Sequence, residues 1–97
     1  MSILDKAFIK DNNLMTRNIA GETLIVPIRN RVGDLSSIYT LNEVGARVWQ
    51  LVDAQTPVAR IVQVITGEYE VSEEEAAADI VELLQDWEAA GLVRAVA

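Results

Sequence analysis

The stretch that decides the fold runs from Ser72 to Gly91 and reads SEEEAAADIVELLQDWEAAG. Ser72 and Glu75 form an S-x-x-E capping box, in which each side chain satisfies a free backbone amide at the start of a helix. Gly91 can adopt the left-handed conformation that ends a helix. The stretch therefore predicts a helix that begins after Ser72 and continues to about Ala90.

The apolar residues of this helix fall on two adjacent stripes at the 100° step of an α-helix. The first stripe is expected to face the core and contains Ala76, Ile80, Leu83 and Trp87. The second stripe widens the apolar arc to roughly 160° and contains Ala77, Val81 and Leu84. One stripe would serve the core, so the second is either covered by the rest of the fold or lines a groove.

Two shorter helices are predicted before this one. Asn42 can cap a helix that runs to about Ala54, in which apolar residues recur at helical spacing. Thr56 can cap a second helix with Pro57 at its first position, and Gly67 can end it. The second half of the chain is thus expected to hold three helices.

Short runs rich in β-branched residues predict three strands ahead of the helices. These runs span residues 15–19, 23–28 and 35–40. Pro27 lacks an amide proton, so it must lie at a bulge or point its nitrogen away from the neighbouring strand. A polar hairpin loop is predicted at residues 29–34 and a last extended segment at 92–96. We expect an α+β fold, a winged helix-turn-helix with a three-stranded antiparallel sheet followed by three helices.

Length and composition predict one small cytoplasmic domain. The 97 residues, 51% of them hydrophobic, can bury one modest core, and we expect a tail over residues 1–14 and the domain over 15–97. Cysteine is absent, which excludes disulfides and thiolate sites and permits a reducing compartment. Charged residues interrupt the N-terminus, unlike a signal peptide, and no stretch reaches the roughly 18 apolar residues of a membrane span.

The charge pattern argues against nucleic acid or an anionic membrane as the partner. Asp and Glu number 15 against 8 Lys and Arg, a net charge of −7. A helix that reads DNA needs basic or amide side chains, whereas the polar residues of the third helix are carboxylates apart from Gln85. A basic segment would suit this chain better as a partner.

The acidic residues do not predict a metal site or an active site. Glu75, Asp79, Glu82 and Asp86 share one helical stripe, but the chain has no His and no glycine-containing calcium loop. A solvated acidic face explains them better. No Ser, Lys or Tyr lies beside a base in an activating motif, so we expect neither catalysis nor a bound cofactor.

The second stripe of the third helix suggests a peptide groove beside the third strand. An extended peptide could pair with the strand edge through backbone hydrogen bonds and place alternate side chains against Ala77, Val81 and Leu84. The edge is polar at Ser36, Ser37 and Thr40, which is compatible with pairing, although polar edges also discourage it.

A set of short stretches carries a family resemblance that spans nearly the whole chain. The most specific is LNEVGA, from Leu41 to Ala46, which continues into Val48, Trp49, Leu51 and Asp53. Further matching stretches are Arg17–Leu24, Ile38–Tyr39, Val58–Val62, Glu68–Val71, Asp79–Ile80 and Gly91–Val93. These stretches resemble the PqqD family.

The resemblance implies a winged-helix module that captures the leader of a ribosomally made precursor peptide. In such modules the leader adds to the third strand, rests against the third helix and is presented to a modifying enzyme, often a radical SAM enzyme. Carried over to this chain, the implied peptide-binding residues are Leu35, Ser36, Ser37, Ile38, Tyr39, Thr40, Ala77, Ile80, Val81 and Leu84. Asp79 and Glu82 are expected at the rim, where they could attract a basic residue of the peptide.

Two departures from the family pattern bear on this interpretation. Asp53-Ala54-Gln55 stands where the family usually has Asp-Gly, which changes the helix ending. The second strand lacks the Leu-Tyr-Pro-Glu-Gly pattern of members that serve pyrroloquinoline quinone (PQQ) synthesis, which favours a relative that serves another peptide. The alternatives left open are a PQQ chaperone proper, a winged-helix regulator of nucleic acid, and a subunit that joins two enzymes.

Overall fold

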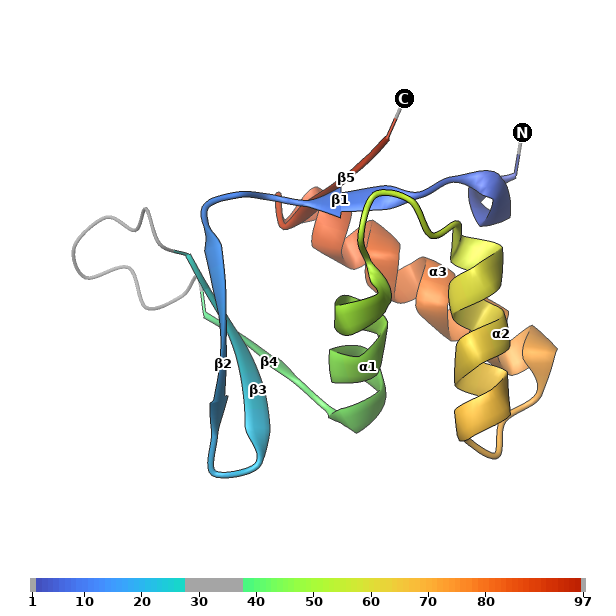
Figure 1. Ribbon diagram of the computed structural model, residues 1–97, viewed down its shortest axis with the longest axis horizontal. Coiled ribbons are helices and arrows are strands. Elements are labelled where there is room, and N and C mark those ends of the chain that lie inside the picture. Colours follow the sequence, from blue (N-terminus) through green and yellow to red (C-terminus); the bar gives the residue numbers. More distant parts are fainter. Residues whose placement is uncertain (1, 28–37, 97) are drawn as a thin grey trace.

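The strands and helices lie in the order that the sequence predicts, with two additional elements at the N-terminus (Figure 1). The computed structural model describes residues 2–27 and 38–96. Its elements are a 3-10 turn η1 (Ile3–Asp5), β1 (Phe8–Lys10), β2 (Leu14–Ile19), β3 (Glu22–Pro27), β4 (Tyr39–Leu41), α1 (Glu43–Leu51), α2 (Val58–Glu68), α3 (Glu73–Ala89) and β5 (Val93–Ala95). The predicted α+β class is confirmed, and the arrangement is winged-helix-like.

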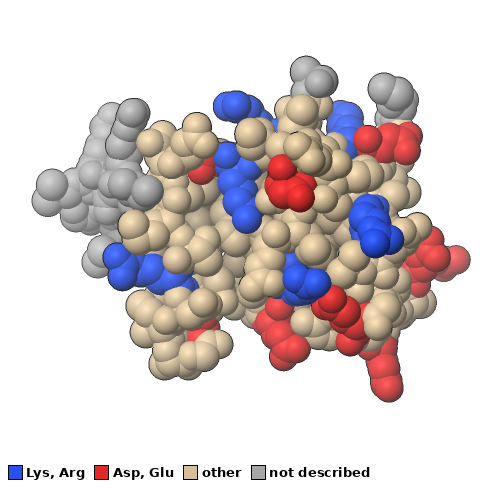
Figure 2. Space-filling view, in the orientation of Figure 1, with Lys and Arg blue, Asp and Glu red and all other residues tan. Residues whose placement is uncertain are grey.

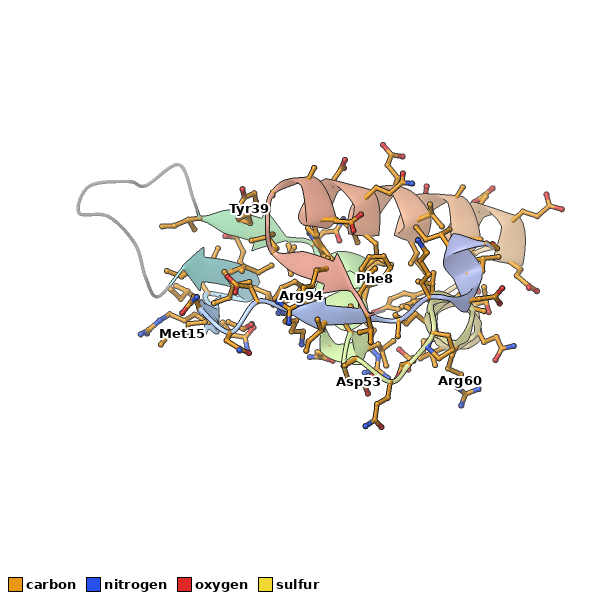
Figure 3. The ribbon with its side chains drawn as sticks, turned by 90° about the horizontal axis from the view of Figure 1, so that it is seen from above. Phe8, Met15, Tyr39, Asp53, Arg60 and Arg94 are labelled. Atoms are coloured by element: carbon orange, nitrogen blue, oxygen red, sulfur yellow. The ribbon has the colours of Figure 1, made fainter. Side chains whose placement is uncertain are left out.

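The three-stranded sheet has the order β2-β3-β4 and is antiparallel throughout. Ala20 and Gly21 both have positive φ in the two-residue turn between β2 and β3, as a tight hairpin requires. β4 pairs with β3 on one side only and is therefore an end strand of this sheet. Seen from above, β4 with Tyr39 lies on the α3 side of the sheet, and β2 with Met15 lies on the other (Figure 3).

Part of the predicted hairpin falls outside the described residues. This applies to Leu35, Ser36 and Ser37 and to the predicted loop at residues 29–34. The described part of the third strand is Tyr39–Leu41, with Tyr39 opposite Ile25 and Leu41 opposite Thr23. β3 ends at Pro27, whose backbone lies opposite Leu14.

The N-terminal residues, for which the sequence predicted a tail, form η1 and β1. β1 pairs antiparallel with β5, so that Ile9 lies opposite Arg94. The amide of Val58 donates to the carbonyl of Lys6 at 2.9 Å, which ties the segment before β1 to the start of α2. Phe8 is only 3% exposed and belongs to the core.

The core lies where the sheet, the helices and β1 meet. Two tryptophans, Trp49 of α1 and Trp87 of α3, pack edge to face with their ring centroids 5.0 Å apart. The indole nitrogen of Trp49 donates to the hydroxyl of Thr16 at 2.9 Å, so α1 is also held to β2. Among the described residues, every fully buried side chain of the core is apolar.

Both ends of α3 are capped, and the Ser72 half of the predicted capping box is confirmed. The Ser72 hydroxyl accepts a hydrogen bond from the Glu75 amide at 3.1 Å. Gly91 has φ +80°, and the amides of Gly91 and Leu92 donate to the carbonyls of Glu88 and Trp87. This is the pattern of a Schellman cap, which satisfies carbonyls that the helix leaves free.

The predicted ends of the two shorter helices were wrong by a few residues. α2 begins at Val58, and Pro57 rather than Thr56 occupies its N-cap position, without a side-chain cap. α2 also continues past Gly67 to Glu68, because Gly67 keeps a helical conformation there. α1 ends at Leu51, three residues before the predicted Ala54, and Ala54 has φ +75°. Ala54 thus takes the left-handed conformation that glycine adopts at least cost.

Candidate functional site

The buried face of α3 differs from the predicted core stripe at one position. Ala76, Ile80 and Trp87 are buried as expected, but the fourth buried residue is Leu84, which is fully covered. Leu83, predicted for the core, is half-buried. Consecutive residues lie 100° apart, so Leu83 and Leu84 flank the centre of the stripe, and the packing of α2 and β5 against α3 decides which one is covered.

A cavity of about 550 Å³ opens beside the Leu83 side of α3. Its floor is apolar and buried, formed by Ile65, Ala76 and Ile80. Its remaining walls come from the start of α1, the connection between α2 and α3, and one side of α3; they are Asn42, Val44, Gly45, Tyr69, Glu70, Val71, Asp79 and Leu83. The arrangement offers an apolar hollow with a few polar groups at its rim, as binding pockets commonly do.

The cavity begins where β4 ends. Leu41 is the last residue of β4, and Asn42, the next residue, lines the cavity and caps α1 by accepting from the Gly45 amide at 2.7 Å. A Cβ at Gly45 would lie 3.1 Å from the Asn42 Oδ1 atom, which is tight. Glycine at this position therefore lets the cap of α1 approach closely, a physical reason for the LNEVG part of the motif.

The structure does not bring all the predicted peptide-binding residues together. Thr40 is exposed and Tyr39 is half-buried on β4, and Ile38 is exposed just before that strand. Asp79 and Ile80 line the cavity. Ala77 and Val81 are half-buried and do not line the cavity. Leu84, predicted for the groove, lies wholly inside the core. Ile80 is 1% exposed and contributes only to the floor of the cavity. Leu35, Ser36 and Ser37 lie outside the described residues.

Several cavity residues were missed by the reasoning from sequence. Val44 belongs to the apolar pattern of the first predicted helix, yet it is 37% exposed and lines the cavity. The position of Val44 in the first turn of a capped helix does not predict its exposure, since the elements packed around a short helix decide which of its sides stays exposed. Glu70 and Val71 follow α2 and lack any periodic signal. The pointers to this region were the family-matching stretches, namely the LNEVG motif, Glu68–Val71 and Asp79–Ile80.

Acidic side chains border the cavity side of α3. At the helical step, Glu75, Asp79, Glu82 and Asp86 form a row next to Leu83, and all four are exposed. In Figure 2 acidic side chains crowd the end of the molecule where α2 meets α3, while Lys and Arg are spread over the rest of that face. Within the described residues one ion pair is found, between Arg47 and Glu68 at 2.8 Å.

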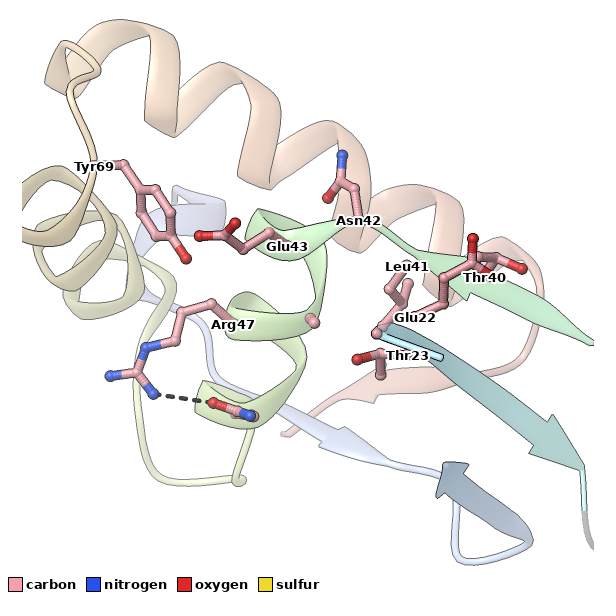
Figure 4. Close-up of a pocket in the computed structure, with 11 residues that line it drawn as sticks. Glu22, Thr23, Thr40, Leu41, Asn42, Glu43, Arg47 and Tyr69 are labelled. Carbon is pink, nitrogen blue, oxygen red and sulfur yellow. Dashed lines mark hydrogen bonds between the residues drawn. The ribbon is translucent and has the colours of Figure 1, made fainter. Parts of the chain in front are cut away.

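A second, more polar hollow of about 720 Å³ lies between the β2–β3 hairpin and α1 (Figure 4). Tyr69 and Asn42 line both hollows. Partial burial raises the pKa of the Tyr69 hydroxyl, and the Glu43 carboxylate raises it further, so Tyr69 remains a hydrogen-bond donor at neutral pH. Arg47 donates to both carboxylate oxygens of Glu68 at 2.8 Å, which lowers the pKa of Glu68 and joins α1 to the end of α2.

Neither a metal site nor a membrane-crossing helix is found among the residues that the structure describes. No three carboxylate side chains there are grouped closely enough to hold a metal ion. None of the helices in that part of the chain has the length and hydropathy needed to cross a bilayer.

These features define a class of protein, a small winged-helix-like module with an end strand beside a helix-lined cavity. The family model described as coenzyme PQQ synthesis protein D (PqqD) matches residues 22–93, most of the chain. The chain belongs to the PqqD family, and the resemblance seen in the sequence is confirmed. No curated protein sequence is detectably similar to it.

Two solved structures share the fold. One is TbiB1 in complex with the TbiA(beta) leader peptide, which is 22% identical, with a TM-score of 0.73 and coverage of 91% of this chain and 96% of that one. The other is lasso peptide synthetase B1 complexed with the leader peptide, also 22% identical, with a TM-score of 0.75 and coverage of 90% and 96%. At this identity the likeness establishes the shared fold.

Proposed function

We propose that this chain is a non-catalytic module that captures the leader of a ribosomally made precursor peptide and presents it to a modifying enzyme. The observation that carries the proposal is the end strand β4, which runs directly into the cavity beside α3. Membership of the PqqD family and the two similar folds with bound leader peptides support it. In this proposal all chemistry belongs to the partner enzyme.

Strand addition gives the proposed capture a physical basis. The outer edge of β4 offers backbone donors and acceptors, which an extended peptide can pair with regardless of its sequence. Because side chains alternate along a strand, every second residue of the peptide would face α3. The proposed site has two parts. The strand part comprises Tyr39 and Thr40 of β4 and the preceding Ile38, and the cavity part comprises Asn42, Val44, Asp79, Ile80 and Leu83.

The partner enzyme is proposed at two levels. The general proposal is a peptide-modifying enzyme in the cytoplasm, where the sequence predicts this chain to work. The family resemblance favours a radical SAM enzyme as that partner. A lasso peptide synthetase is a second candidate, favoured by the two similar folds, one of which is itself named as a synthetase component. The absence of the Leu-Tyr-Pro-Glu-Gly pattern speaks against the PQQ pathway for this chain.

Titration calorimetry tests the proposal with short peptides encoded near the gene for this chain. Ordering a flexible peptide offsets part of the binding energy, so we expect dissociation constants from high nanomolar to micromolar, about 8 to 9 kcal/mol. On adding peptide, amide chemical shifts should move most for Ile38–Leu41 and Asp79–Leu83. Shifts confined to the exposed face of α2, around Arg60–Val64, would place the site elsewhere.

A further inference from the structure

The cavity beside α3 has room for a large apolar side chain. Its volume of about 550 Å³ is open on one side, and its floor of Ile65, Ala76 and Ile80 contributes only carbon atoms from the side chains. Val44 and Leu83 stand at the mouth with part of their apolar surface exposed. Filling this hollow would remove apolar surface of both partners from water, which favours association.

The charged residues that line the cavity, Glu70 and Asp79, are both acidic. Nine of the chain's 15 acidic residues lie between Ile61 and Val93, a segment without Lys or Arg. The six acidic residues elsewhere are outnumbered by all 8 basic residues, so the excess negative charge belongs to the segment that contains α3. Asp79 and Glu70 line the cavity itself, and neither has a cationic partner within residues 2–27 and 38–96.

The spacing of these groups matches an extended peptide. In Figures 1 and 3 the axes of β4 and α3 are roughly aligned, although the chain runs in opposite directions along them, so a strand added to β4 would run along α3. Asp79 and Leu83 are one helical turn apart, a rise of about 6 Å at 1.5 Å per residue. Two residues of a strand that face the same way are separated by about 6.6 Å. Neighbouring inward side chains of the peptide can therefore meet Leu83 and Asp79 in turn.

We propose that the recognised segment carries a large apolar residue and, two positions away, a lysine or arginine. The apolar residue fills the cavity between α1 and α3, and the cation faces Asp79 and Glu70 at its rim. This inference rests on the proposed function, because it names the class of peptide that the site selects. A cation at the rim also speeds encounter with the acidic face of α3 and disfavours acidic competitors.

Selection from a displayed library of random 12-residue peptides tests the inference, with the purified chain as bait. We expect enriched peptides to share a large apolar residue with Lys or Arg at the second position before or after it. Enrichment of peptides without this pairing would overturn the inference and leave the proposed function intact. If no peptide is enriched over an unrelated acidic domain, the proposed function itself fails, and the inference with it.

A charge-reversal experiment tests whether Asp79 is the carboxylate that pairs with the basic residue of the peptide. Asp79→Lys should weaken the selected peptide at least tenfold, and exchanging the peptide's Lys or Arg for Glu should restore at least part of that loss. Glu74→Lys is the matched control, because this substitution changes the net charge by the same amount as Asp79→Lys. Glu74 is exposed on α3 and does not line the cavity. The control should change affinity less than threefold. Equal losses for the two variants would mean that only the overall charge matters, and the assignment to Asp79 would be wrong.

Discussion

Both flanks of α3 carry apolar residues, but the surroundings of the two flanks differ. On one flank Leu83 opens onto a cavity beside β4 and is bordered by the acidic row of Glu75, Asp79, Glu82 and Asp86. On the other, Ala77 and Val81 are half-buried, pack against the core and do not line that cavity. The comparison teaches that an amphipathic pattern tells how wide the apolar arc of a helix is, whereas the neighbouring elements decide which margin remains free to bind.

The largest expected effect comes from the stripe that separates the two flanks. Ile80 is 1% exposed in the middle of α3. Ile80→Asp would bury an uncompensated charge and should cost at least about 4 kcal/mol of the free energy of unfolding. Urea unfolding followed by circular dichroism measures this. An Ile80→Asp protein that unfolds at the parent's urea concentration would show that the stripe is not the core of the domain.

A direct comparison of the flanks should give the next largest effect. Leu83→Asp should weaken a selected peptide at least tenfold, or about 1.4 kcal/mol, because it places a carboxylate where an apolar side chain is expected. Val81→Asp, which the sequence nominated for the groove, is the matched variant on the other flank and should change the affinity less than threefold. Fluorescence anisotropy with a labelled peptide distinguishes them, and the reverse ranking would return the site to the Val81 flank.

A stabilised background would make this comparison cleaner, because both aspartate variants cost some stability. Ala54 has φ +75°, a conformation that costs alanine roughly 1–2 kcal/mol. Ala54→Gly should raise the free energy of unfolding by about 0.5 to 1 kcal/mol, since greater freedom of the unfolded chain cancels part of the relief. Differential scanning calorimetry should show a higher Tm with unchanged peptide affinity.

The matching control for this substitution is Ala78→Gly, at an exposed interior position of α3. Glycine in a regular helix should lower the stability by about 1 kcal/mol. If Ala54→Gly and Ala78→Gly destabilise the protein alike, the left-handed conformation of Ala54 carries no strain.

The smallest expected effect is the loss of stability when the Arg47–Glu68 ion pair, next to the cavity wall, is removed. Hydrogen bonds from Arg47 lower the pKa of Glu68, next to Tyr69 and Glu70 of the cavity wall. A lowered folded-state pKa means that the pair stabilises the fold above the ordinary glutamate pKa of about 4.3. That contribution is lost as the pH falls through the folded-state pKa.

Glu68→Gln should therefore lower the urea midpoint slightly at pH 7, and the difference from the parent should vanish at acid pH. Glu74→Gln, on the exposed face of α3, should show no such pH-dependent difference. A Glu68→Gln protein that differs from the parent equally at both pH values would mean that the carboxylate charge has no part in the effect.

Local signals in the sequence determined the class of fold and the limits of α3. The capping box at Ser72 and the glycine at Gly91 act through hydrogen bonds within a few residues, so the sequence shows them directly. The LNEVGA motif, which pointed to the family, is also local: Asn42 and Gly45 form one helix cap within four residues. The positions of the acidic residues along the chain placed the negative charge on α3, and this placement does not depend on how the elements pack.

Only the tertiary structure decided the site. Leu83 and Leu84 are equivalent by periodicity, and the packing of α2 and β5 against α3 covers Leu84 and leaves Leu83 at the cavity. The exposure of Val44 has the same kind of cause, since most residues that line the cavity with it come from α2, α3 and their connection, more than 20 positions away. The partnership of β1 with β5 was also beyond local patterns, because a three-residue strand is stabilised by a distant segment and by the burial of Phe8. A cavity is a property of how elements meet, and no single stretch of the chain encodes it.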